Sequence, residues 1–357
     1  MHIDLYVAVA GLLVGFTVGL TGMGGGALMT PILILLFKVQ PLTAVSSDLV
    51  ASMIMKPVGA SVHQRRGTVN WSLVRWLAAG SIPSAFLGVF ILKHLGNGAV
   101  VEGRLKLALG VALMVASTSI VAKGFLQLRR ARRREVLILA GRSADPGPFS
   151  PKPLPTVLMG VFGGGIVGMT SVGSGSLIIV SLLLLYPMLS AKELVGTDLM
   201  QAIPLVASAA LGHILFGDFR LSLTASVLLG SLPGVYLGAR LSSRAPDGLI
   251  RPALVFVLLA SGLKLLDLST TQLVVALAAF VVLALPIWGV VDAVTRPRHH
   301  WEIAGLSRRL WVGVQAGGAM AGVGFLAAIV YLASVRPKLN AAGLMSIVSV
   351  RGDEILV

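Results

Sequence analysis

The chain has 357 residues and a formal net charge of +15, yet 56% of its residues are hydrophobic and only 12% are charged. Soluble globular proteins carry about 25% charged residues, so this composition excludes a water-soluble protein. The apolar stretches are long enough to cross a lipid bilayer, which predicts a polytopic membrane protein. Cysteine is absent, and this excludes disulfides, thiol catalysis and cysteine-bound metals.

Five apolar segments are expected in residues 1–124, the first transmembrane repeat. The second of them is too short to cross about 30 Å of hydrocarbon, because 11 residues give roughly 16 Å of helix. We expect it to be either a re-entrant half-helix or the lower part of a tilted span. The five segments occupy about residues 5–21, 27–37, 44–63, 71–92 and 104–123.

A basic linker is expected at residues 125–154, with five arginines between positions 129 and 134. Basic residues between apolar spans mark cytoplasmic loops. No aromatic or groove-reading motif accompanies this charge, so we expect no nucleic-acid partner.

Residues 155–268 are expected to form a second transmembrane repeat, again with one short segment. Two additional transmembrane helices are expected within residues 269–335, at about 271–291 and 310–333, followed by a C-terminal tail at 336–357. The predicted fold is therefore an all-α polytopic membrane protein. The segments of the second repeat occupy about residues 155–170, 176–186, 192–213, 221–241 and 249–266.

The two halves share one sequence pattern, and each is interrupted by glycine. Two related apolar halves of this kind are typical of secondary transporters, whose binding site lies between the repeats. If the linker is cytoplasmic, an inverted second half also places Arg240, Arg244 and Arg251 inside, as the positive-inside rule favours. The matching pairs lie 150 residues apart and include Asp48 and Asp198, His63 and His213, Gly80 and Gly230, and Pro83 and Pro233.

A glycine-rich break precedes the short segment in each half. Backbone N–H groups at the start of a helix are a favourable site for an anion, and neighbouring hydroxyls add neutral donors. The alternative is close helix packing, for which small residues are equally suited. The predicted substrate-binding residues of the breaks are Thr21, Gly24, Gly25, Gly26, Thr170, Ser171, Gly173, Ser174 and Gly175.

Asp48 and Asp198 form the second matching pair, and each follows a hydroxyl residue, Ser47 or Thr197. A carboxylate within a membrane segment costs about 2.5–3.5 kcal/mol on insertion scales, so both aspartates are candidates for carrying a coupled proton. The alternative is that each caps the third helix of its half. We expect the two hydroxyls to face the substrate, because an ionised carboxylate repels an anion.

Four further polar residues lie in the same predicted helices. Lys56 either attracts an anion or extends its ammonium to the surface. Gln201 follows Asp198 by three residues and is expected on the same helix face. His63 and His213 are candidates for a proton relay, although an interfacial histidine before a turn explains them as well.

These motifs resemble the TauE/SafE family of sulfite exporters. The resemblance rests on the glycine pattern from Gly15 to Gly26, on Ala44-Val-Ser-Ser-Asp-Leu49, and on Gly168-Met-Thr-Ser-Val-Gly-Ser-Gly-Ser-Leu177 with Gly196-Thr-Asp-Leu199. It covers about residues 5–267. It implies a multi-pass protein of the bacterial cytoplasmic (inner) membrane that moves sulfite, organosulfonates or related anions, often outward.

The sequence therefore predicts a secondary transporter of small sulfur-containing anions that works by alternating access. The expected partners are a small anion, the lipid bilayer, protons as a candidate coupling ion, and a second copy of the chain. We expect no cofactor, no metal and no enzymatic activity, because no membrane-embedded nucleophile-and-base pair or metal spacing is present. An anion channel and a transporter of a non-sulfur organic anion are the alternatives.

Overall fold

The protein is helical throughout the part that the structure describes. The computed structural model describes residues 3–21, 25–65, 67–94, 99–139, 150–241, 247–320 and 324–342, and every regular element among them is a helix. Five of these helices are long and apolar enough to cross a membrane. The predicted all-α polytopic membrane fold is confirmed. The five spans are Trp71–His94, Val100–Gln127, Pro153–Thr170, Lys192–Phe216 and Leu221–Leu241.

The chain divides into two compact units. The first unit contains Met1–Gly124 and Gly147–Ser269, and the second contains Phe125–Pro146 and Thr270–Val357. Helix α5 (Ala99–Leu139) continues from the first into the second. The arginine-rich start of the expected linker is therefore helical, because it extends a helix that is already formed.

The first unit contains both sequence repeats. Its short helices α2 and α7 have ten and nine residues and follow the glycine-rich breaks, as expected. Besides α5, the first repeat forms α1 (Leu5–Thr21), α2 (Gly26–Leu35), α3 (Pro41–Arg65) and α4 (Trp71–His94). The second repeat forms α6 (Pro153–Thr170), α7 (Leu177–Leu185), α8 (Ala191–Phe216), α9 (Leu221–Leu241) and α10 (Asp247–Leu265).

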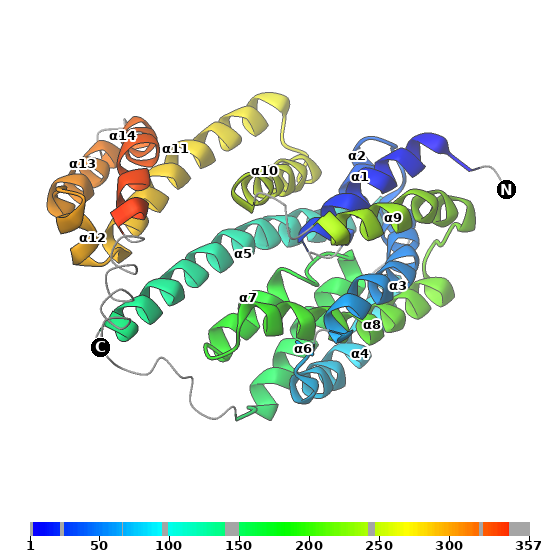
Figure 1. Cartoon of the computed structure of the whole chain (residues 1–357). Coiled ribbons are helices and arrows are strands. Elements are labelled where there is room, and N and C mark those ends of the chain that lie inside the picture. Colours follow the sequence, from blue (N-terminus) through cyan, green and yellow to red (C-terminus); the bar gives the residue numbers. More distant parts are fainter. Residues whose placement is uncertain are drawn as a thin grey trace. The chain divides into compact units, whose positions relative to one another are not determined.

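The helices of the two halves pack across each other (Figure 1). The most extensive contacts join α1 to α9 and α4 to α6, so the first helix of each half packs on the fourth helix of the other. The third helices, α3 and α8, pack directly together between these pairs. Exchanging the two halves therefore reproduces the main helix contacts.

Glycine makes these crossed pairs close. A Cβ atom added to Gly11 would lie 2.7 Å from the carbonyl oxygen of Val227, and one added to Gly164 would lie 2.5 Å from that of Ser81. Small residues let membrane helices approach to backbone contact, and van der Waals packing then holds them together. Close packing of this kind is present along both pairs. The glycines that face the partner backbone are Gly11, Gly15 and Gly19 in α1, Gly230, Gly234 and Gly238 in α9, Gly80 and Gly88 in α4, and Gly160, Gly164 and Gly168 in α6.

The second unit contains the C-terminal helices α11 (Thr270–Thr295), α12 (Arg298–Ile303), α13 (Arg308–Met320) and α14 (Gly324–Val330), and a π-helical turn at Tyr331–Val335. The expected single span at 310–333 is instead two short helices, α13 and α14, that pack against each other and α11. Glycine is frequent between positions 313 and 324 and weakens a continuous helix there. A buried carboxylate ties this unit together, since Asp292 accepts hydrogen bonds from Arg296 and Tyr331.

Candidate functional site

The second glycine-rich break is an irregular turn between α6 and α7. Helix α6 ends at Thr170, and Ser171 adopts a left-handed conformation with φ of 59°. Gly173 and Gly175 have φ of 118° and 96°, which side-chain-bearing residues rarely adopt. The glycine and serine sequence therefore reverses the chain within the protein interior, where Ser171 and Ser174 are buried.

The first break meets the second at Gly26. A Cβ atom at Gly26 would overlap the backbone and hydroxyl of Ser171, whereas one at Gly25 would meet only the Met55 side chain, at 3.6 Å. Gly24 lies outside the described residues. Residues 145 positions apart in the sequence thus come into direct contact between the halves.

Asp48 accepts hydrogen bonds from one hydroxyl of α2 and one hydroxyl of the second break. Its Oδ2 atom accepts hydrogen bonds from Ser171 Oγ at 2.7 Å and from Thr30 Oγ1 at 2.9 Å. The carboxylate is 1% exposed and lies on the eighth residue of α3. A capping role for Asp48 is therefore wrong, because a cap must precede the first turn.

Lys56 reaches into the interior and contacts the second break. Its ammonium donates to Ser174 Oγ at 2.6 Å, and it interacts electrostatically with Asp48 and Asp198. The alternative that this side chain extends to the surface is wrong for the observed conformation, in which Lys56 is 9% exposed. The structure therefore places one buried cation beside two buried carboxylates.

Asp198 occupies the matching position in α8 but has different surroundings. The backbone amide of Gly175 acts on its carboxylate as a hydrogen-bond donor, and Lys56 and Lys123 act on it electrostatically. Its Oδ1 atom is buried and has no partner of normal hydrogen-bond geometry among the described residues. Asp198 does not cap α8, because Ser190 and Glu193 form a capping box there. The Gly175 amide of the second break thus faces a carboxylate of the protein itself.

The side chains of Ser47 and Thr197 hold neighbouring helices. Ser47 Oγ accepts from the backbone amide of Arg220 at 3.3 Å, just before α9. Thr197 Oγ1 accepts from the amide of Asn70 at 3.0 Å, just before α4. The two contacts correspond through the repeat, so each hydroxyl fixes the start of the other half's fourth helix. A direct contact of either with substrate stays a prediction that this geometry does not favour.

The described side chains of the remaining candidates also make hydrogen bonds within the protein. The Thr21 and Thr170 hydroxyls donate to carbonyl oxygens four residues earlier, in the last turns of α1 and α6. His213 is buried and joins three helices through Ser46 Oγ and the carbonyl oxygen of Gly168, each at 2.8 Å. The side chain of His63 lies outside the described part of the chain.

Gln201 follows Asp198 by about one turn of α8 and is fully buried. Its Oε1 atom accepts from Ser81 Oγ at 3.2 Å. Its Nε2 atom makes no hydrogen bond to any residue that the structure describes. Sequence reasoning missed Ser81 and Thr30 as polar partners, and Thr30 has no counterpart in the second half that could have signalled a role.

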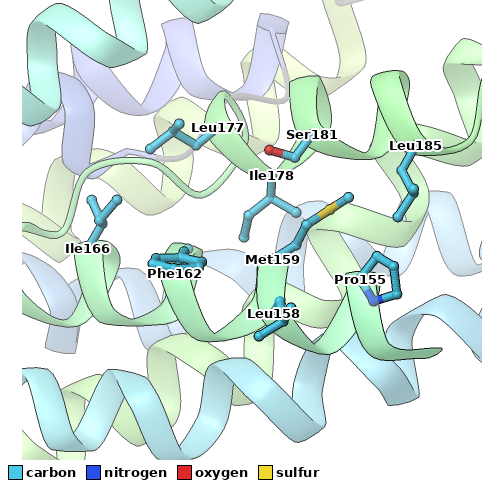
Figure 2. A pocket seen from close by; sticks show the side chains of 10 residues that line it. Pro155, Leu158, Met159, Phe162, Ile166, Leu177, Ile178, Ser181 and Leu185 are labelled. Atoms are coloured by element: carbon cyan, nitrogen blue, oxygen red, sulfur yellow. The ribbon is translucent and has the colours of Figure 1, made fainter. Parts of the chain in front are cut away.

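A separate groove lies between α6 and α7. It has a volume of about 360 Å³, and Figure 2 shows its largely apolar lining, with Phe162, Ile166 and Met159 among the side chains that face it. Ser181 supplies the one labelled side-chain hydroxyl. This lining suits a hydrocarbon chain and offers few donors to an oxyanion. The polar residues at the breaks are therefore the stronger candidate for anion binding.

Comparison with known proteins agrees with this architecture. The sequence profile described as "Sulfite exporter TauE/SafE" matches residues 7–265. The chain belongs to the TauE/SafE family. The match ends five positions before α11 begins, so it covers both repeats and leaves the C-terminal helices outside.

Curated relatives have the length of the two repeats. The chain is 41% identical over 262 residues to the Bacillus subtilis (strain 168) "Probable membrane transporter protein YjnA", which covers 73% of this chain and 98% of the relative. It is 26% identical over 258 residues to YdhB of the same organism, described in the same words, with 71% of this chain and 96% of the relative covered. No solved structure matches the chain. The protein is a multi-pass membrane protein of a transporter family.

Proposed function

We propose that this TauE/SafE protein is a secondary transporter that exports small sulfur-containing anions, such as sulfite or an organosulfonate, across the bacterial cytoplasmic membrane. The observation that carries the proposal is the buried ammonium of Lys56, which bonds to Ser174 in the second break. A cation placed within apolar helices is costly and is a functional candidate by default. It supplies the attraction that an anion requires in the interior.

The crossed helix pairs support alternating access. Each half contributes its first helix to one pair and its fourth helix to the other, while α3 and α8 meet between them. The polar residues at the breaks lie where the halves meet, since Ser171 and Ser174 contact Asp48 and Lys56 of the opposite half. Rocking of one half against the other would change access to this site from each side.

Charge balance supports protons as the coupling ion. With both carboxylates ionised, the buried groups Asp48, Asp198 and Lys56 together carry one net negative charge, and a bound anion adds another. Lys123 also acts on Asp198, but it is only half-buried, so solvent screens its charge more strongly. Like charges at short range in a weakly screened interior repel strongly. Protonation of one carboxylate removes that repulsion, so a proton accompanies the anion in this proposal.

The test is sulfite flux into proteoliposomes, measured with and without an imposed proton gradient. Saturable flux that responds to the gradient is expected for the natural protein. Lys56→Met should abolish flux, because it removes the attracting charge. Lys264→Met alters an exposed lysine of α10 and should leave flux unchanged.

Three outcomes would contradict the proposal. Flux that rises linearly with sulfite concentration would identify a channel. Unchanged saturable transport by Lys56→Met would remove the role of the buried cation. No flux of sulfite, sulfonates or carboxylates by folded, inserted protein would overturn the transporter function itself.

A further inference from the structure

Three buried polar atoms near the second break have no hydrogen-bond partner among the described residues. They are Ser176 Oγ, Asp198 Oδ1 and Gln201 Nε2, on side chains that are 6%, 1% and 0% exposed. Most buried polar atoms in proteins are paired, because an unpaired one loses its hydration without compensation. A group of unpaired atoms in one region therefore indicates a partner that the chain itself does not supply.

The three atoms belong to one region of the second half. Ser176 directly precedes the nine-residue helix α7 and makes no capping hydrogen bond. Helix α7 packs against α8, and the backbone amide of the neighbouring Gly175 acts on the Asp198 carboxylate. Gln201 lies three residues after Asp198, on the same face of α8. A hydroxyl group at the positive end of α7 and the carboxyl and amide groups of one face of α8 thus belong to two helices that pack together.

The corresponding region of the first half lacks this arrangement. The repeat places Ala27 opposite Ser176 and Ala51 opposite Gln201, so two of the three polar groups are absent there. The third, Asp48, accepts two hydrogen bonds from hydroxyls. The unpaired atoms are therefore a property of the second half and not a general result of the duplicated fold.

We propose that this group is an asymmetric oxyanion subsite in which Asp198 binds the transported proton. The oxygens of a sulfite or sulfonate group accept hydrogen bonds from Gln201 Nε2, Ser176 Oγ and the protonated Asp198 carboxyl, while Lys56 supplies the positive charge. The inference rests on the proposed transport function and assigns its substrate contacts and its proton site. Asp48 is a positioning residue that holds Ser171 and Thr30.

The charges around Asp198 agree with the assignment of the proton to Asp198 and of a positioning role to Asp48. The charged groups that act on its carboxylate are Lys56 from α3 and Lys123 from α5. Lys56 is shared with Asp48, so it cannot fully compensate both carboxylates and an anion. Because binding free energies are reciprocal, a proton on Asp198 raises anion affinity by the factor by which the anion raises proton affinity.

The proposal requires that proton and anion move together. For a singly charged anion this movement transfers no net charge. Export then proceeds only while the outward gradient of the anion exceeds the inward gradient of protons. The membrane potential has no direct effect on such a step.

The experiment compares sulfite binding by the purified full-length protein at several pH values with proton-driven sulfite uptake into proteoliposomes. Wild-type affinity should fall by about tenfold or more as pH rises, which is within the usual range for coupled sites. Asp198→Asn replaces the carboxyl group with a neutral donor. It should bind sulfite tightly at every pH and exchange it across the membrane, yet lose the response to the proton gradient.

Asp48→Asn is the matched control, because it makes the same change at the repeat-related position. It should weaken binding and exchange together, since it alters the bonds to Ser171 and Thr30, but keep the pH dependence. All variants meet the same mixture of sulfite and bisulfite, so a difference in proton response belongs to the protein. Elution as a single species and an unchanged melting temperature establish that each variant is folded.

Gln201→Ala gives an independent test that changes no charge. It should raise the Kd for sulfite by about tenfold, the usual cost of losing a hydrogen bond to a charged group. If buried water fills the site instead, this variant keeps the wild-type Kd, and the proposal is overturned. A retained gradient response in Asp198→Asn, or its loss in Asp48→Asn, overturns it as well. Each of these results would overturn the proposed subsite but not the proposed transport function, provided that the wild-type protein still moves sulfite.

Discussion

At the scale of single residues, the repeat-related aspartates have unequal environments. Asp48 receives two hydroxyl hydrogen bonds, whereas Asp198 retains an unpaired oxygen beside the start of α7. The difference comes from their neighbours, because the second break carries serine at three positions where the first carries glycine or alanine. Duplicated sequence therefore produces two different chemical sites.

The contact between the two breaks gives a prediction at single-residue resolution. Gly26→Ala should abolish transport, because its methyl group would displace Ser171 and break the bond from Ser171 to Asp48. Gly25→Ala should retain transport, since its nearest neighbour is a flexible methionine methyl at 3.6 Å and its backbone is already helical. Sulfite flux per inserted protein distinguishes them. Equal activities would exclude a functional contact between the breaks.

At the scale of elements, the molecule is held by two equivalent helix pairs. In α1 with α9, and in α4 with α6, glycines spaced four residues apart bring the backbones into contact. Helices in lipid gain little from hydrophobic burial, so close van der Waals contact is a main source of their association. Within these helix pairs, glycine is therefore required on the contact face.

Neighbouring glycines of α6 test this requirement. Gly164→Ala should lower the melting temperature of the purified protein, because its methyl group would lie 2.5 Å from the Ser81 carbonyl oxygen and separate α4 from α6. Overpacking of this kind typically costs about 1–3 kcal/mol. Gly165→Ala has open space around it and should leave the melting temperature unchanged. Equal melting temperatures would contradict the assigned contact face.

At the scale of the whole molecule, family resemblance and structure agree on where the shared unit ends. The family match stops at residue 265, and the first compact unit ends at Ser269. The second unit has its own core around Trp301 and Tyr331, with the buried Asp292–Arg296 ion pair. The alignments with the two relatives span 262 and 258 residues and cover 98% and 96% of those proteins, so each relative has about the length of the family match.

Truncation after Ser269 should therefore leave an inserted protein with saturable sulfite flux. Truncation after Leu241 should abolish flux, because it also removes α10, which packs on α2 and accepts a hydrogen bond from Ser117 of α5 at the Val255 carbonyl. Flux per inserted molecule is the measurement. Loss of transport in the first truncation, with the protein folded and inserted, would make the C-terminal helices part of the transport machinery.

The sequence by itself determined the membrane class, the duplication, the two short helices and the region of the candidate site. Hydropathy, helix length and glycine runs are properties of neighbouring residues, so the expected segments at 27–37 and 176–186 became α2 and α7 with small shifts. The positions of Asp48, Lys56 and Asp198 within apolar helices were readable for the same reason.

Only the tertiary structure decided what these side chains contact. Lys56 meets Ser174, which lies 118 residues away, and Ser171 meets Asp48 across 123 residues. Ser47 and Thr197 hold the starts of α9 and α4, contacts that the sequence did not indicate, and their contact with substrate stays a prediction. A local sequence pattern determines the helix on which a side chain lies. The partner of that side chain depends on how distant helices cross, and here glycine contacts between the halves set that crossing.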